Sequence, residues 1–158
     1  MTVGVVGMSS APLSPSDPLL VDAQGRVDEI AALLEERLYE FNVRATGFSD
    51  GKPVCFTIAN DAGAIIAGIA GYTWGGCCHI RQLWVDEAHR GGRLGTALLE
   101  AAEREAMERN CRQVVISTHT FQAPGFYARL GYTEVARVVG HPIGHANVFL
   151  AKQLAASR

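Results

Sequence analysis

A run of arginines and glycines is the part of this sequence best suited to chemistry. It consists of Arg90, Gly91, Gly92, Arg93, Leu94, Gly95 and Thr96. A glycine-rich turn that opens a helix presents unpaired backbone N–H groups and the positive end of the helix dipole to an anion. Arg90 and Arg93 add fixed positive charge that suits phosphate oxygens. The run therefore predicts a phosphate-binding turn.

Composition narrows the kind of phosphate. The chain has 158 residues and a net charge of -2, which gives no reason to expect a nucleic-acid partner. Lys52 and Lys152 are its lysines, and the sequence has no Gly-Lys-Ser/Thr run, so a Walker-type loop is excluded. The glycine spacing also differs from the Gly-x-Gly-x-x-Gly pattern of dinucleotide-binding folds. Phosphate is the natural ligand of this turn, and the alternative is that its glycines only make a tight turn.

Two elements must position this turn. Residues 78–85 are predicted to form the strand that leads into it, and their imperfect apolar alternation allows a bulge. After a loop at residues 86–92, helical periodicity runs to residue 109. The apolar side of that helix carries Leu98, Leu99, Ala102 and Ala106.

The remaining patterns predict the rest of an α/β sandwich with a mixed sheet. The expected order is strand, helix, two or three antiparallel strands, helix, strand, helix and two strands. Apolar runs and turn residues place these elements as follows: an amphipathic helix at 26–44, a hairpin of 53–59 and 64–74, a buried parallel strand at 113–117, a short helix at 124–130, and closing strands at 132–139 and 148–154.

Two segments resemble the signatures of one enzyme family. Residues 85–99, which contain the glycine run, resemble the acetyl-CoA signature of the GNAT N-acetyltransferases. Residues 123–132 are similar to the family's second signature, Ala-x-x-Phe-Tyr-x-x-x-Gly-Phe/Tyr. The resemblance covers about residues 26–154 and implies a mixed, mostly antiparallel central sheet flanked by helices. We expect a flexible N-terminal arm at 1–18 and a single acetyltransferase domain at 19–158.

The resemblance implies roles for individual residues. Backbone N–H groups from Arg90 to Thr96 would hold the pyrophosphate of acetyl-CoA, and Tyr127 matches the tyrosine that protonates the departing thiolate. Arg93 stands where the signature has its first glycine, so we expect either a negative φ there or a transfer of the glycine role to Gly92. The other implied cofactor contacts are the backbone of Leu83, Trp84 and Val85, which would pair with the pantetheine arm, and Thr120, which replaces an asparagine found near the pantetheine in many members.

The general base is the least determined part of the prediction. An ammonium must lose its proton before it attacks a thioester. Residues 77–82, where several family members carry a glutamate, contain no carboxylate here, but His79 can accept a proton near neutral pH. His119 and a water relay are the alternatives.

The predicted function is transfer of an acetyl group from acetyl-CoA to a primary amine by direct attack in a ternary complex. The expected acceptor is a small-molecule or peptide amine, with no nucleic acid, membrane or metal involved, and family resemblance suggests a homodimer. The chain start lacks a secretory pattern, so we expect a cytoplasmic protein. Two alternatives stay open: a non-catalytic acyl-CoA-binding or sensing module, and a metal or redox protein built on Cys77, Cys78 and His79.

Overall fold

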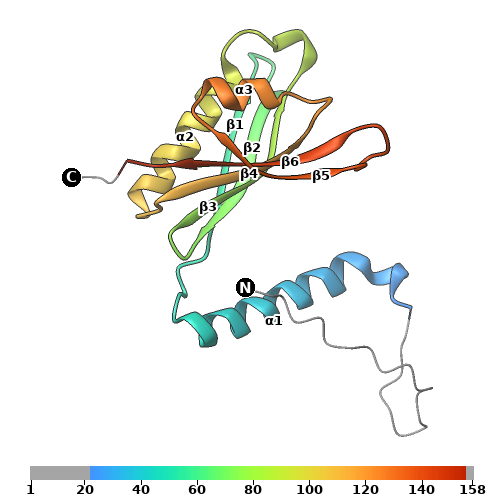
Figure 1. Ribbon diagram of the computed structural model, residues 1–158, viewed down its shortest axis with the longest axis vertical. Helices are drawn as coiled ribbons and strands as arrows, with labels where there is room; N and C mark the ends of the chain where they lie inside the picture. The colour runs from blue at the N-terminus through green and yellow to red at the C-terminus, as the bar shows by residue number, and fades with distance from the viewer. Residues whose placement is uncertain (1–21, 156–158) are drawn as a thin grey trace, which may run out of the picture. The chain divides into compact units, whose positions relative to one another are not determined.

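The structure is a computed structural model that describes residues 22–155. The N-terminal arm expected at 1–18 and the first strand of the expected order lie outside the described residues. The elements in chain order are η1 (Gln24–Arg26), α1 (Val27–Thr46), β1 (Lys52–Ala59), β2 (Ile65–Trp74), β3 (Cys77–Val85), η2 (Glu87–His89), α2 (Leu94–Glu108), β4 (Gln113–His119), α3 (Pro124–Arg129), β5 (Thr133–Val139) and β6 (Ala146–Gln153) (Figure 1). Each helix and strand expected within the described residues is present.

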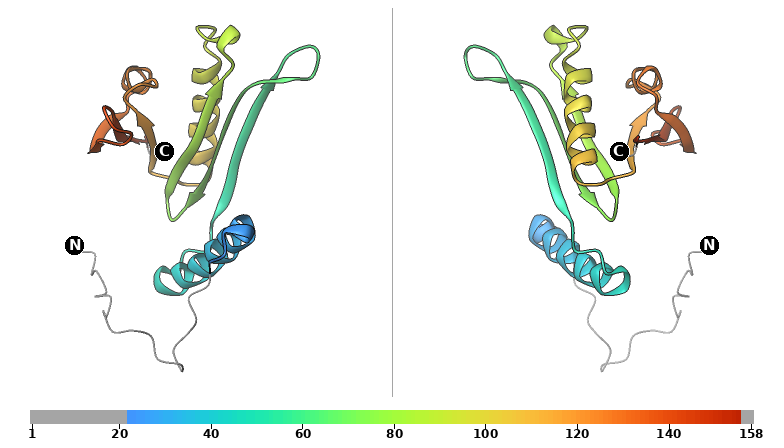
Figure 2. Two further views of the ribbon diagram at one scale, coloured as in Figure 1. Left: turned by 90° about the vertical axis from the view of Figure 1, so that its right-hand side faces the viewer. Right: turned by 90° about the vertical axis from the view of Figure 1, so that its left-hand side faces the viewer.

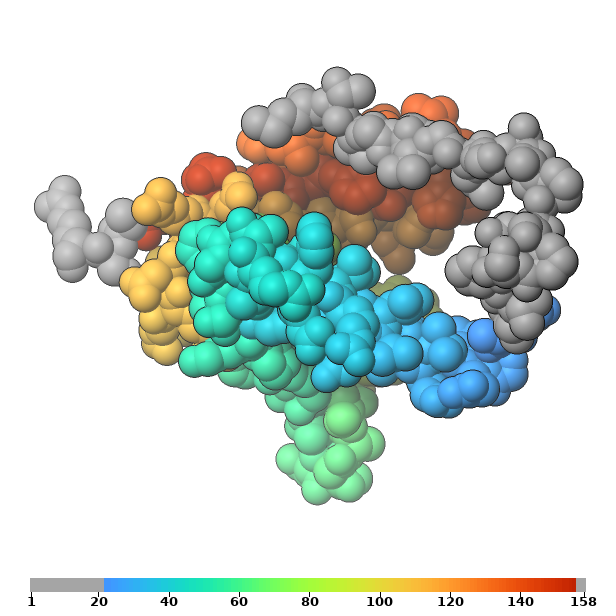
Figure 3. All heavy atoms as spheres, turned by 90° about the horizontal axis from the view of Figure 1, so that it is seen from below, coloured from blue at the N-terminus to red at the C-terminus, as the bar shows by residue number. Residues whose placement is uncertain are grey.

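The residues that the structure describes divide into two units after Phe41, and this boundary falls within α1. No residue of α1 is buried, and its side chains are the blue to cyan spheres of Figure 3. Exposed ion pairs one helical turn apart, Arg26 with Glu29 and Arg37 with Glu40, support the helix. The helix predicted at 26–44 is confirmed, and packing of its apolar side stays a prediction.

The second unit is built on a six-stranded sheet in the order β1-β2-β3-β4-β6-β5. Neighbouring strands are antiparallel except β3 and β4, which are parallel. The β3–β4 ladder joins Cys77–Ile80 to Gln113–Ile116 and then stops. Beyond it the two strands separate, and Figure 2 shows the two halves of the sheet diverging toward the end that carries α3. The mixed, mostly antiparallel sheet is confirmed.

Helix α2 covers one face of this sheet, alongside the strands in Figure 2. Its apolar side buries the four residues that periodicity predicted, Leu98, Leu99, Ala102 and Ala106. Alternate residues of the strands, among them Val54, Ile80 and Val114, face it from the sheet and are buried as well. The core therefore lies between α2 and the sheet, and it fixes where the first turn of α2 stands relative to β3.

The predicted irregularity in the third strand is a bulge. Ile80 pairs with Gly71 of β2 and Gln82 pairs with Ala70, so Arg81 is the extra residue. A Cβ on Gly71 would lie 2.1 Å from the carbonyl oxygen of His79. Position 71 must therefore be glycine for the two backbones to approach this closely.

Candidate active site

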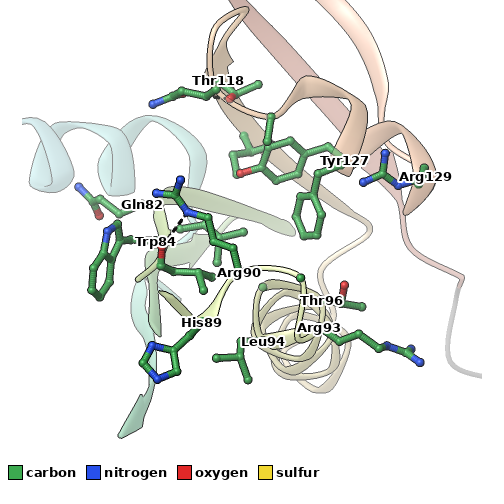
Figure 4. Close-up of a pocket in the computed structure, with 18 of the residues that line it drawn as sticks. Gln82, Trp84, His89, Arg90, Arg93, Leu94, Thr96, Thr118, Tyr127 and Arg129 are labelled. Atoms are coloured by element: carbon green, nitrogen blue, oxygen red, sulfur yellow. Dashed lines mark hydrogen bonds between the residues drawn. The ribbon is translucent and has the colours of Figure 1, made fainter. Parts of the chain in front are cut away.

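A groove of about 870 Å³ opens where β3 and β4 separate. Its walls are the last residues of β3, the turn and first residues of α2, the end of β4 with the loop that follows, and α3 (Figure 4). Both family-like signatures therefore contribute to one site, as expected if they act on one ligand.

The turn before α2 is held in place by local bonds. The Asp86 carboxylate accepts hydrogen bonds from the Ala88 amide at 3.2 Å and from His89 Nδ1 at 2.7 Å. The bond from His89 is the largest of the effects that lower the pKa of the Asp86 carboxyl. Arg90 Nε donates to the Val85 carbonyl oxygen at 3.3 Å, which binds the turn back to β3.

The first helical hydrogen bond of α2 runs from the Ala97 amide to the carbonyl of Arg93 at 3.0 Å. The amides of Leu94, Gly95 and Thr96 precede it, and in the described part of the chain no side chain caps this helix end. All three residues line the groove. These amides and the helix dipole make this wall of the groove suited to phosphate oxygens.

Arg93 adopts a left-handed backbone conformation, with φ 62° and ψ 8°. Neither expectation for this position holds, because φ is not negative and Gly92 is not among the glycines of positive φ. Gly91, at φ 81°, also has a left-handed backbone. The Arg93 side chain is exposed and extends past the start of α2, away from Arg90 (Figure 4).

Residues Leu83, Trp84 and Val85 line the groove, and their backbone edge on the side of β4 has no strand partner, although the Val85 carbonyl accepts the bond from Arg90 Nε. On one side they pair with Ile69, Gly68 and Ala67 of β2. On the other side, the ladder with β4 has already ended at Ile80. An extended amide-containing chain could therefore add to this edge as a strand does.

Tyr127 of α3 is 6% exposed, and its hydroxyl points into the space between Thr118 and Arg90 (Figure 4). The rings of Phe126 and Tyr132 pack edge-on against it, with centroids 5.0 and 5.9 Å away. Burial raises the pKa of the Tyr127 hydroxyl. The group is thus protonated at neutral pH and directed into the groove, as a general acid must be.

The sequence reasoning missed Gln122, which lines the groove near Tyr127. Its Oε1 accepts hydrogen bonds from the Thr118 hydroxyl at 3.0 Å and from the His119 amide at 2.9 Å. Because a backbone N–H can bond to the amide oxygen but not to the NH₂ group, the orientation of the Gln122 amide is fixed. A glutamine in a loop gives no sequence signal of this kind.

Thr120 does not line the groove. Its hydroxyl oxygen accepts a hydrogen bond from the Ala146 amide at 3.1 Å, and its own amide donates to the Ala146 carbonyl at 2.9 Å. The structure thus uses Thr120 to join the loop after β4 to β6. A pantetheine contact at Thr120 stays a prediction from the family resemblance.

His79 also lies outside the groove lining. Because Cys78 and Ile80 are buried on the side of α2, the alternation of β3 puts His79 on the other face of the sheet. Its Nδ1 lies 2.9 Å from the Tyr72 hydroxyl. Burial, followed by the positive charge of Arg81, lowers the pKa of His79, so its imidazole is neutral at pH 7.

The cysteines do not form a metal centre. Among residues 22–155 no group of three His, Cys, Asp or Glu side chains could hold a metal ion. Cys55, Cys77, Cys78 and Cys111 are free thiols. Burial raises the pKa of Cys77 and Cys111, and that of Cys78 to about 12, so these three remain protonated.

In the same part of the chain no helix is long and apolar enough to cross a membrane.

Residues 22–132 match the model of the acetyltransferase (GNAT) family. The chain belongs to this family, and it is an acyltransferase. The match includes the groove turn and the second signature, so the resemblance read from residues 85–99 and 123–132 is confirmed.

Similar proteins agree with this assignment. A blasticidin-S acetyltransferase of Streptomyces morookaense is 37% identical over 116 residues, which cover 71% of this chain and 85% of that protein. A crystal structure of an acetyltransferase from Bacillus cereus has a TM-score of 0.74 and 29% identity, covering 87% of this chain and 98% of that one. A Bacillus anthracis acetyltransferase solved with acetyl coenzyme A shares the fold, with a TM-score of 0.58, 18% identity, and coverage of 65% of this chain and 63% of that one.

Proposed function

We propose that this protein transfers an acetyl group from acetyl-CoA to a primary amine by direct attack in a ternary complex. One observation carries the proposal: the free amides of α2, the edge of Leu83–Val85 that has no strand partner and the buried hydroxyl of Tyr127 lie in a single groove. The relatives named as acetyltransferases, one acting on blasticidin S, support a small-molecule amine as the acceptor.

Each part of the groove has a task in this proposal. The amides of Leu94, Gly95 and Thr96 hold the pyrophosphate, and the edge of β3 orders the pantetheine arm. The amide Nε2 of Gln122 donates to a carbonyl of the arm. These contacts place the thioester near the end of the β3–β4 ladder, where the two strands are no longer paired. An amine can then approach the thioester from the opposite face of the sheet.

The chemical step forms one bond and breaks another. The neutral amine attacks the thioester carbonyl, the C–N bond forms and the C–S bond breaks. The thiolate takes the proton of the Tyr127 hydroxyl, and the amine's surplus proton leaves through a base. Solvent then restores the proton of Tyr127.

We assign the role of general base to His79. Because this residue does not line the groove, it acts through a water molecule. The lowered pKa of its imidazole leaves it able to accept a proton. The bond to Tyr72 orients the ring, and Nε2 accepts the proton when Nδ1–H donates to the Tyr72 oxygen. His119, on the same face of the sheet, is the alternative base.

An amine-panel assay for thiol release tests this function. We expect release of free CoA with at least one amine. We expect Tyr127→Phe to lower kcat by about 10²- to 10⁴-fold while the Kd for acetyl-CoA stays the same. Normal turnover in Tyr127→Phe would remove it as the acid. Cofactor binding without turnover of any amine would favour the acyl-CoA-binding module instead. A cytoplasmic location and a homodimer stay predictions.

A further inference from the structure

Four rings from two separate segments meet beside the groove. We call His119, Phe121, His141 and His145 the ring cluster. His119 stacks on Phe121 with centroids 5.2 Å apart and an angle of 20°, and its ring also lies 5.5 Å from that of His141. His145 meets Phe121 edge-on at 4.9 Å. These separations are those of favourable aromatic pairs.

The backbone holds the ring cluster in place. The turn between β5 and β6, which carries His141 and His145, is closed by the Gly140 amide bonding to the His145 carbonyl at 2.8 Å. Thr120, which stands between the other two rings in sequence, makes both of its hydrogen bonds to Ala146 at the foot of that turn. These bonds join the two segments that carry the rings.

The ring cluster adjoins the groove through Phe121, the member of the cluster that lines it. Phe121 is 55% exposed and lines the groove itself. His119 follows Ser117 and Thr118, which line the groove where β3 and β4 have separated. Because Thr118 is buried toward α2, the alternation of β4 puts His119 on the face of the sheet opposite α2. An amine that reaches the thioester from that face has its remaining atoms over these rings.

The chemistry of the ring cluster selects the acceptor. Residues 117–123 and 139–147 contain no Asp, Glu, Lys or Arg, so apart from the histidines neither segment brings an ionisable side chain of these kinds to the acceptor. They offer ring faces and edges instead. Resting on the proposed acetyltransferase function, we infer that the acceptor carries a planar aromatic or heteroaromatic ring near its amine, and that the ring cluster binds this ring.

Two amines of matched shape test the inference. The assay measures kcat/KM for 2-phenylethylamine and 2-cyclohexylethylamine, which differ in the aromaticity of the ring. The wild-type protein should prefer the phenyl compound by about two- to tenfold, the range of one ring–ring contact. Phe121→Leu should remove that preference through KM. Thr120→Val, which keeps all four rings but frees the turn, should weaken it.

Phe48→Leu is the matched control, because Phe48 is 52% exposed and lies beside Gly75 at the opposite end of β3 from the groove. It should keep the wild-type preference. Equal use of both amines by the wild-type protein would overturn the inference and leave the proposed function standing, whereas no turnover of any amine would overturn both. Sedimentation showing a dimer that Phe121→Leu dissociates would make the ring cluster a contact between copies and would also overturn the inference.

Discussion

The left-handed backbone of Arg93 leads to a prediction about stability that separates the effect of the backbone conformation from that of the side chain. For a residue with a Cβ this conformation costs about 1–2 kcal/mol. Glycine has no such penalty, but its greater freedom in the unfolded chain costs about 0.5–1 kcal/mol. Arg93→Gly should therefore raise the free energy of unfolding by about 0.5–1 kcal/mol. Arg93→Ala keeps the Cβ and the strained φ of 62°, so it should give no gain.

Urea unfolding without cofactor measures this difference. Arg93→Gly should be more stable than Arg93→Ala by about 1 kcal/mol, which corresponds to about 2–4 °C in Tm for a chain of this size. Both variants lack the guanidinium, so their Kd for acetyl-CoA should rise equally, by up to about fivefold for an exposed charge. If the glycine variant is no more stable than the alanine variant, the turn is not strained at position 93, and the explanation is wrong.

Three further perturbations have defined outcomes. Gly71→Ala puts a Cβ against the His79 carbonyl and should lower the free energy of unfolding, measured in urea, by more than about 2 kcal/mol. In the control Gly68→Ala, the new Cβ would meet its nearest atoms at 3.6 Å, so the cost should be under about 1 kcal/mol. Equal costs would contradict the bulge geometry. Arg109→Met removes bonds to the carbonyls of Lys52 and Pro53 and to Thr73, so it should cost about 2 kcal/mol in the same assay, while exposed Arg104→Met should change little. Since the pKa of His79 lies below its ordinary 6.5, kcat/KM for one amine should fall only as the pH drops below that value; Arg81→Gln should move this fall to higher pH, and its persistence in His79→Gln would exclude His79 as the base.

Patterns along the chain predicted the elements well, because each face of the sheet and of α2 repeats with its own period. The four buried residues of α2 follow from a period of 3.6 residues, and the bulge follows from broken alternation in β3. Glycine spacing and the strand-to-helix setting similarly located the phosphate-binding wall.

Other features depend on contacts between distant segments, which have no local pattern. Thr120 bonds to Ala146, and nothing near Thr120 in the sequence indicates this partner. The backbone conformation of Arg93 was predicted wrongly. The expectation rested on the preference of a residue with a Cβ for negative φ, whereas the turn requires a left-handed backbone at this position. Gln122 was missed although its bond to the His119 amide is local, because a glutamine in a loop gives no sequence signal of such a bond.

The short β3–β4 ladder leaves the sheet without strand pairing beyond Ile80 and Ile116. Four residue pairs between β3 and β4 join the two antiparallel halves of the sheet. Beyond them, the backbone of Leu83–Val85 has no strand partner on the side of β4. A cofactor arm seated there would act as a temporary seventh strand, so loading would also be a folding event. Amides along that edge would exchange slowly with solvent when acetyl-CoA is bound, and Tm would climb with its concentration.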